Sequence, residues 1–219
     1  MNDLKTDSFG THRPILCELL KITRGNIIEL GCGNSSTKLI NSIISNSDRK
    51  LISLESNPEW LNKFSGLEGD NHKLFHVDCS ASDTIKTGEE WVDFIINNKY
   101  INNIEFELCF IDQSPWSART STFNYFKNKC KYILLHDADY FPFFNLWGKN
   151  VKKIRTNNLN LQKYEMDFSD VIKNFKAYYP PENYFCGPTG PPTLLASNLL
   201  SKPEFEEIVS KINLSQYYD

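Results

Sequence analysis

Residues 26–40, which read NIIELGCGNSSTKLI, constrain the fold of this chain more than any other segment. The apolar run 27–30 is typical of a buried strand, Gly31 and Gly33 indicate a turn, and a helix is expected to begin within 34–36. Glycine has no Cβ, so the backbone of such a turn can approach a ligand closely. The free N–H groups and the positive dipole end of the helix face the same turn. The segment therefore predicts a nucleotide-like ligand at a first strand–turn–helix unit.

Glu29, just inside the end of the strand, selects among such ligands. A carboxylate there disfavours a pyrophosphate, because like charges repel in a low-dielectric site. The order of an acidic residue, a hydrophobic residue and Gly-x-Gly resembles motif I of the class I S-adenosylmethionine (SAM)-dependent methyltransferases. SAM carries a sulfonium and an ammonium but no phosphate. Ser36 stands where the dinucleotide fingerprint has Gly or Ala, and Ser35 stands where a third glycine is common in the methyltransferases.

Strand-like apolar segments alternate with helix-like segments along the chain, which is typical of a parallel sheet flanked by helices. We expect strands near residues 26–30, 50–54, 73–77, 105–111, 131–136, 159–164 and 193–197. We expect helices near residues 12–23, 35–46, 57–65, 88–98, 119–128, 140–147 and 203–211. The resemblance implies an α/β fold with a seven-stranded, mostly parallel sheet, helices on both faces and an antiparallel last strand pair. A length of 219 residues suits a single domain spanning 1–219.

The segment 164–192 is rich in aromatic residues and prolines and exceeds an ordinary connection between strands. It is interpreted as a lid or substrate-recognition insert, with an aromatic cover over the edge of the sheet as an equal alternative.

Ligands of open α/β sheets bind at the carboxyl ends of the strands. Glu55, about twenty residues beyond the glycines, can accept hydrogen bonds from a ribose diol. The resemblance places the adenine amino group near Asp78 and Cys79. The predicted cofactor-binding residues are Glu29, Gly31, Gly33, Ser35, Glu55, Asp78, Cys79 and Asp112.

Asp112 closes an apolar strand, and His136, Asp137 and Asp139 follow the next one. Asp112, His136 and Asp137 are the predicted catalytic residues. In one interpretation His136 or an acid is a general base that takes a proton from an acceptor hydroxyl. In another, Asp112, Asp137 and Asp139 bind Mg²⁺, which lowers the pKa of that hydroxyl. In a third, His136 caps a helix and Asp137 alone points inward.

Residues 113–116, QSPW, partly match the motif after strand four of enzymes that methylate amino groups, with Ser114 in place of a proline. Trp116 and Arg119 are expected to face the substrate, and the first helix, with His12 at its start, is expected to close over the cofactor.

Composition excludes several classes of function. A formal net charge of -3 disfavours nucleic-acid binding. The sequence has neither an apolar run of membrane-spanning length nor a signal peptide. Six cysteines without metal-ligand spacing indicate free thiols and a cytoplasmic location. The oligomeric state stays open.

The sequence thus predicts a SAM-dependent methyltransferase that moves a methyl group to an oxygen of a small, glycosyl or other polyhydroxyl acceptor. A non-catalytic methyltransferase-fold scaffold is the main alternative. An N-methyltransferase and an NAD(P)-dependent oxidoreductase are less favoured.

Overall fold

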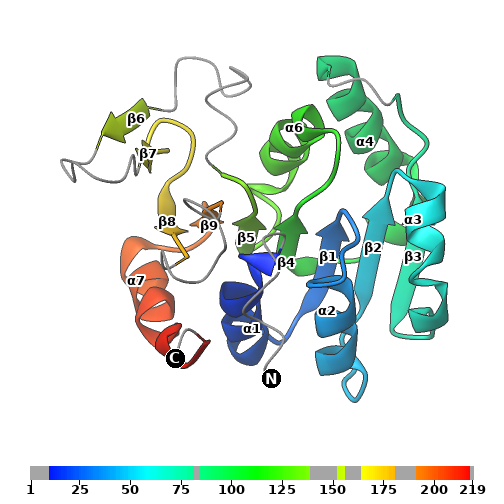
Figure 1. The fold of residues 1–219 in the computed structure, drawn as a ribbon, viewed down its shortest axis with the longest axis horizontal. Helices are drawn as coiled ribbons and strands as arrows, with labels where there is room; N and C mark the ends of the chain where they lie inside the picture. Colours follow the sequence, from blue (N-terminus) through cyan, green and yellow to red (C-terminus); the bar gives the residue numbers. More distant parts are fainter. Residues whose placement is uncertain (1–9, 81–83, 139–151, 156–163, 181–190, 218–219) are drawn as a thin grey trace.

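The central element of the structure, a computed structural model, is a seven-stranded sheet in the order β3-β2-β1-β4-β5-β9-β8 (Figure 1). The structure describes residues 10–80, 84–138, 152–155, 164–180 and 191–217. The strands of the sheet are β1 (Asn26–Leu30), β2 (Leu51–Glu55), β3 (His72–His76), β4 (Phe106–Ile111), β5 (Tyr132–Leu135), β8 (Asn174–Tyr178) and β9 (Thr193–Ser197). β1 to β5 are parallel, whereas β9 is antiparallel to both β5 and β8.

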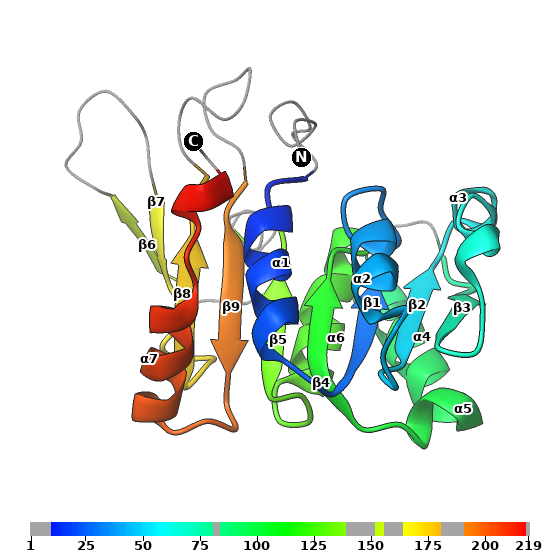
Figure 2. The same ribbon diagram turned by 90° about the horizontal axis from the view of Figure 1, so that it is seen from below.

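Helices cover both faces of this sheet (Figure 2). One face carries α1 (Arg13–Ile22), α2 (Thr37–Ile44) and α7 (Lys202–Lys211), and the other carries α4 (Ile85–Asn97), α5 (Lys99–Asn102) and α6 (Trp116–Phe126). The short helix α3 (Pro58–Asn62) packs against β2 and β3. Ile27 lies in the hydrophobic core under α1, α2 and α7, and Ile28 lies in the core under α4, α5 and α6. Successive side chains of a strand point to opposite faces of the sheet. The predicted architecture is confirmed.

The carboxyl ends of the central strands are held in register beyond the strands themselves. The Gly31 amide donates to the Leu54 carbonyl at 2.8 Å, and the Asp112 amide donates to the Leu30 carbonyl at 2.7 Å. The His136 amide continues this pattern on the Ile111 carbonyl at 3.0 Å. The residues that follow β1, β4 and β5 are therefore fixed as firmly as the strands that present them.

The far edge of the sheet differs from the sequence prediction. A strand was expected near 159–164, a range of which only residue 164 lies within the described residues, and the strand that pairs with β9 is β8, at 174–178. β8 lies inside the segment 164–192, for which a lid or insert and an aromatic cover over the edge of the sheet were equal alternatives, and Phe168 in the same segment is fully buried. Aromatic residues that resemble a binding loop in the sequence here complete the sheet edge and its core.

Two further strands, which precede β8 in the chain, form a separate small sheet. β6 (Lys152–Arg155) and β7 (Tyr164–Asp167) make an antiparallel two-stranded sheet. The predicted helix at 140–147 and residues 181–190 of the predicted lid lie outside the described residues, so the lid stays a prediction. Among the helices that the structure describes, none has the length and apolar character needed to cross a membrane.

Replacing Gly31 with alanine should destabilise the fold. Gly31 has φ 90°, and an added Cβ would lie 2.6 Å from the backbone carbon and oxygen of Asp112. Strain of this kind lowers the free energy of unfolding by about 2 kcal/mol or more. Gly66→Ala is the matched control, because a Cβ there meets nothing within 4 Å. Urea denaturation of both variants checks this; equal stabilities would contradict it.

Candidate cofactor and catalytic site

A chain of polar contacts supports the glycine turn from below. The Gly33 amide donates to Thr37 Oγ1 at 2.8 Å, and Thr37 Oγ1 donates to Glu29 Oε1 at 3.0 Å. Ser53 Oγ of the neighbouring strand donates to Glu29 Oε2 at 2.6 Å. The Glu29 carboxylate thus connects β1, β2 and the start of α2 at the point where the turn is made.

Glu29 itself is fully buried, and burial raises the pKa of its carboxyl to about 7 despite the hydrogen bonds that oppose the shift. Its side chain lines neither of the two pockets described below. Glu29 was predicted to contact the cofactor. In the structure its carboxylate supports the turn through Thr37 and Ser53, an indirect role that could not be read from the motif alone, and a direct contact with a cofactor stays a prediction.

The Glu55 carboxylate, at the end of β2, lies beside the glycine turn as predicted. Glu55 Oε2 accepts a hydrogen bond from the Cys32 amide at 3.0 Å, and Oε1 accepts one from the Asn57 amide at 2.8 Å. Burial raises the pKa of Glu55. Glu55 and Cys79 line a pocket of about 560 Å³ at the ends of β2 and β3. Asp78, the other predicted adenine contact, is exposed and is not among the residues that line this pocket.

The three predicted catalytic residues come together at the adjacent strand ends. His136 Nδ1 lies 3.0 Å from Asp112 Oδ1 and 3.6 Å from Asp137 Oδ1. Arg119, on α6, pairs with Asp112 Oδ1 at 3.0 Å and with Asp137 Oδ2 at 2.9 Å. Asp137 has φ 52°, a left-handed conformation that aims its carboxylate back toward the arginine. Residues separated by 24 positions in the sequence thus form one charged cluster.

The charges in this cluster shift one another's pKa values. Burial raises the pKa of Asp112, but His136 and Arg119 together lower it to about 2. Burial lowers the pKa of His136, but the Asp112 and Asp137 carboxylates outweigh that effect and raise it. Asp112 is therefore ionised at neutral pH, and a proton on His136 is stabilised by both neighbouring acids.

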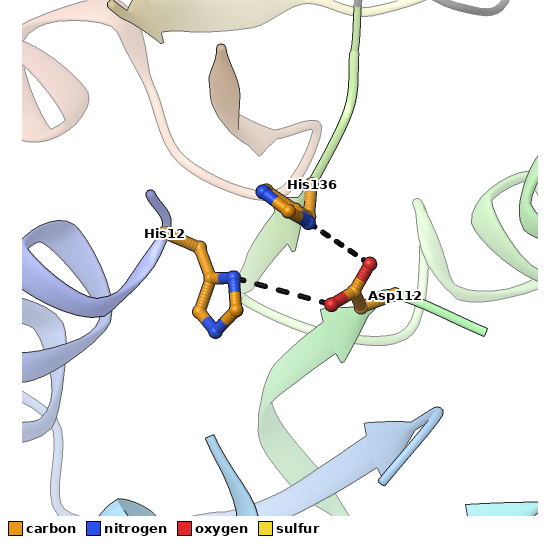
Figure 3. A group of neighbouring side chains, drawn as sticks. All are labelled: His12, Asp112 and His136. Carbon is orange, nitrogen blue, oxygen red and sulfur yellow. Dashed lines mark hydrogen bonds and ion pairs between the residues drawn. The ribbon is translucent and has the colours of Figure 1, made fainter. Parts of the chain in front are cut away.

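Two residues before α1 complete the site. Thr11 Oγ1 lies 2.6 Å from His136 Nε2, so both nitrogens of that imidazole are engaged. His12 lies with its ring 4.6 Å from the His136 ring and its Nδ1 3.9 Å from Asp112 Oδ2 (Figure 3). The sequence placed the first helix near the cofactor but did not predict this contact, because nothing local marks a histidine that meets a strand end 100 residues away.

The cluster opens into a pocket of about 400 Å³. The pocket is lined by His12, Cys32, Gly33, Asn34, Ser35, Trp60, Asp112, Trp116, Arg119, His136 and Asp137. Gly33 and Ser35, two of the predicted cofactor-binding residues, therefore line a cavity, and their contact with a cofactor stays a prediction. This pocket and the one at Glu55 adjoin at the hydrogen bond between Glu55 and Cys32, because each residue lines one of them.

The predicted Mg²⁺ site between carboxylates does not fit the structure. Asp112 and Asp137 already share one cation, the Arg119 guanidinium, and Asp139 lies outside the described residues. Arg119 was expected to bind substrate. Its Nε donates to the Gln113 carbonyl and its Nη atoms donate to the carbonyls of Asp112 and His136 as well as to the two acids. All of its donors are used within the protein, so its role is to bind the strand ends together.

Comparisons with known proteins are consistent with the fold. No protein-family model matches the chain, and no curated protein sequence matches it. Spermidine synthase from Thermotoga maritima has a TM-score of 0.53 at 13% identity, over 96% of this chain and 73% of that chain. Human methyltransferase-like protein 13 in complex with SAH has a TM-score of 0.44 at 12% identity, over 93% of this chain and 87% of that chain. The 23S rRNA methyltransferase ErmE has a TM-score of 0.41 at 12% identity, over 89% of this chain and 72% of that chain.

The likeness to the synthase shows a shared fold, and at this identity it carries no activity across. The strand order and the antiparallel last strand pair confirm the class I methyltransferase-like architecture that the sequence predicted.

Glu29→Gln should flatten the dependence of stability on pH. The pKa of Glu29 rises from its ordinary 4.5 to about 7 on folding. Its contribution to stability is therefore present below pH 4.5 and is lost as the pH rises to 7, a loss on the order of 3 kcal/mol. Urea denaturation between pH 4.5 and 7.5 should show this slope in the wild type and in the exposed control Glu68→Gln. An unchanged slope in Glu29→Gln would refute the assignment.

Proposed function

We propose that this protein is a SAM-dependent methyltransferase that acts on an oxygen of a small acceptor. The observation that carries the proposal is the pair of adjoining pockets at the carboxyl ends of the strands, one beside Glu55 and the other beside the Asp112–His136 pair. Open α/β sheets bind their ligands at this edge. In this proposal the pocket beside Glu55 holds the nucleoside of SAM, and the pocket beside the Asp112–His136 pair holds the acceptor and is where the methyl group is transferred.

The residues around the first pocket fit a nucleoside without phosphates. The carboxylate of Glu55 is held by backbone amides in a fixed orientation, and such a group can accept hydrogen bonds from a ribose diol. Cys79 and Pro115 give the pocket apolar walls. The absence of phosphates matters because Glu55 and Glu29 both lie close to the glycine turn. When bound, SAM supplies a methyl group activated by its sulfonium.

The second pocket suits a neutral, hydroxyl-bearing acceptor. Trp60 and Trp116 offer indole faces, and Asp112 and His136 lie among its polar lining. Aromatic faces above polar groups are well suited to a sugar ring. We therefore favour a glycosyl or other polyhydroxyl acceptor. The enclosing walls would hold an acceptor oxygen in line for displacement, and such positioning supplies much of the catalysis of a bimolecular transfer.

The Asp112–His136 pair is the proposed proton acceptor. Asp112 orients the imidazole through Nδ1, and Nε2 lies 2.6 Å from Thr11 Oγ1. The acceptor hydroxyl would therefore pass its proton to Nε2 by taking the place of the Thr11 hydroxyl or through that hydroxyl. Because the neighbouring acids raise the pKa of His136, activity should increase with pH as the imidazole loses its proton.

Transfer to nitrogen is less well supported. In the amino-methylating enzymes that residues 113–116 resemble, the side chain at the start of the motif faces the substrate amine. Here Gln113 is fully buried, and its Nε2 donates to Thr122 of α6 at 2.7 Å. The amide therefore faces the protein core. A nucleic-acid acceptor is disfavoured by the formal net charge of -3. The cytoplasmic location stays a prediction.

Calorimetric titration with S-adenosylhomocysteine (SAH) tests the cofactor. We expect saturable binding that Glu55→Gln weakens about 10-fold or more, because the diol loses a charged acceptor. Glu68→Gln, an exposed change of the same kind, should bind as the wild type does. NAD⁺ is titrated in parallel. No binding of SAH would refute the methyltransferase, and binding of NAD⁺ in its place would favour the oxidoreductase.

Methyl transfer from SAM to a panel of monosaccharides and glycosides tests the chemistry. His136→Gln should lower kcat about 100-fold or more with little change in the Kd of SAH, because general bases contribute about that factor. The exposed His76 provides the control, and His76→Gln should leave kcat unchanged. Equal kcat values for His136→Gln and the wild type would remove His136 from the mechanism. Binding of SAH without turnover on any acceptor would favour the scaffold.

A further inference from the structure

His12 is a buried polar side chain without a hydrogen-bond partner among the described residues. The residue is 2% exposed, and neither of its ring nitrogens has a hydrogen-bond partner in the part of the chain that the structure describes. Buried polar atoms in native proteins almost always have a partner, so each exception calls for a physical reason. The ring packs against Phe110 at 4.7 Å and His136 at 4.6 Å. Packing accounts for its position and leaves its two nitrogens unexplained.

The groups that face His12 are ligand atoms. His12, Asp112 and His136 each offer one nitrogen or oxygen, and these atoms lie within 4.8 Å of one another. Figure 3 shows the two imidazoles, one from the residue before α1 and one from the residue after β5, both facing the Asp112 carboxylate. Ligand atoms that share one ion at about 2.0–2.2 Å lie roughly 3–4 Å apart. Small side-chain rotations would therefore close this group around an ion.

We propose that His12, Asp112 and His136 bind a first-row transition-metal ion of the zinc class. Two imidazoles and one carboxylate form the donor set of catalytic zinc and non-haem iron sites, and such sites keep one or more coordination positions open. Mg²⁺ is a poor fit, because it favours oxygen ligands and retains its waters. The inference concerns a binding site and does not depend on methyl transfer.

Neighbouring residues already orient each ligand. Thr11 Oγ1 holds His136 Nε2 at 2.6 Å, so Nδ1 points to the cluster. Arg119 holds Asp112 Oδ1 at 3.0 Å, which leaves Oδ2 facing His12. Partners of this kind, one step removed from the ion, fix the ligands of known metal sites.

The local charge accommodates a cation. Asp112 and Asp137 carry two negative charges against one positive charge on Arg119. The guanidinium lies on the Oδ1 side of Asp112, away from the oxygen that faces His12. The three ligands also line the pocket of about 400 Å³, so an ion can enter and an acceptor oxygen can reach it. With an ion bound there, His136 would serve as a ligand through Nδ1 in place of its role as proton acceptor, and the ion would lower the pKa of that oxygen instead.

Calorimetric titration of the chelator-treated full-length chain with ZnCl₂ tests the site. We expect one ion per chain with a Kd in the micromolar range or tighter, and at least tenfold weaker binding of MgCl₂. His12→Phe retains an aromatic ring for packing and should weaken Zn²⁺ binding about 100-fold or more. His76→Phe alters an exposed histidine and should bind Zn²⁺ as the wild type does. No stoichiometric binding, or undiminished binding by His12→Phe, would overturn the proposal.

X-ray absorption at the zinc edge of the wild-type complex gives a second readout that does not require a variant to fold. Two imidazole nitrogens and oxygen ligands at about 2.0–2.2 Å would support the site, whereas sulfur at about 2.3 Å would assign the ion to cysteine and overturn it. SAH titrations run with and without Zn²⁺ separate the two proposals. A wild-type chain that binds Zn²⁺ but not SAH would refute the proposed function, whereas one that binds SAH but not Zn²⁺ would refute the metal site.

Discussion

The buried guanidinium of Arg119 is the interaction on which the rest of the site depends. It donates to backbone carbonyls after β4 and β5 and pairs with Asp112 and Asp137. Without this cation, two carboxylates and a histidine would be forced together with only the imidazole to balance them. Breaking a buried pair of this kind is strongly destabilising, because it leaves charges uncompensated. The arginine thus allows two acids to lie beside each other at the floor of a pocket.

A second buried carboxylate, that of Glu29, holds the glycine turn in place through hydrogen bonds. Glu29 receives hydrogen bonds from Thr37 and Ser53, and Thr37 in turn accepts one from Gly33. The motif that identifies a cofactor turn in the sequence therefore acts through an interior network. The geometry of the turn thus depends on one buried residue.

Local sequence patterns predicted the centre of the fold better than its edge. The strands β1, β2, β4 and β5 are short apolar runs that end at glycine, at an acidic residue or, for β5, at His136, and each lies within one or two residues of its expected position. β8 was not predicted, because NFKAY is half exposed and sits among aromatic residues that resemble a loop. An edge strand is stabilised by pairing with a partner distant in the sequence, which no local pattern records.

The sequence by itself determined the α/β alternation, the glycine turn and the acids at the strand ends. These follow from hydrophobic periodicity and backbone geometry, which act over a few residues. Only the tertiary structure decided that Thr11 and His12 contact Asp112 and His136. It also decided that every donor of Arg119 is used within the protein and that Glu29 lies below the turn. Those outcomes depend on which helix packs on which face of the sheet. Packing brings together side chains 100 residues apart, and it leaves no periodic signal at either end.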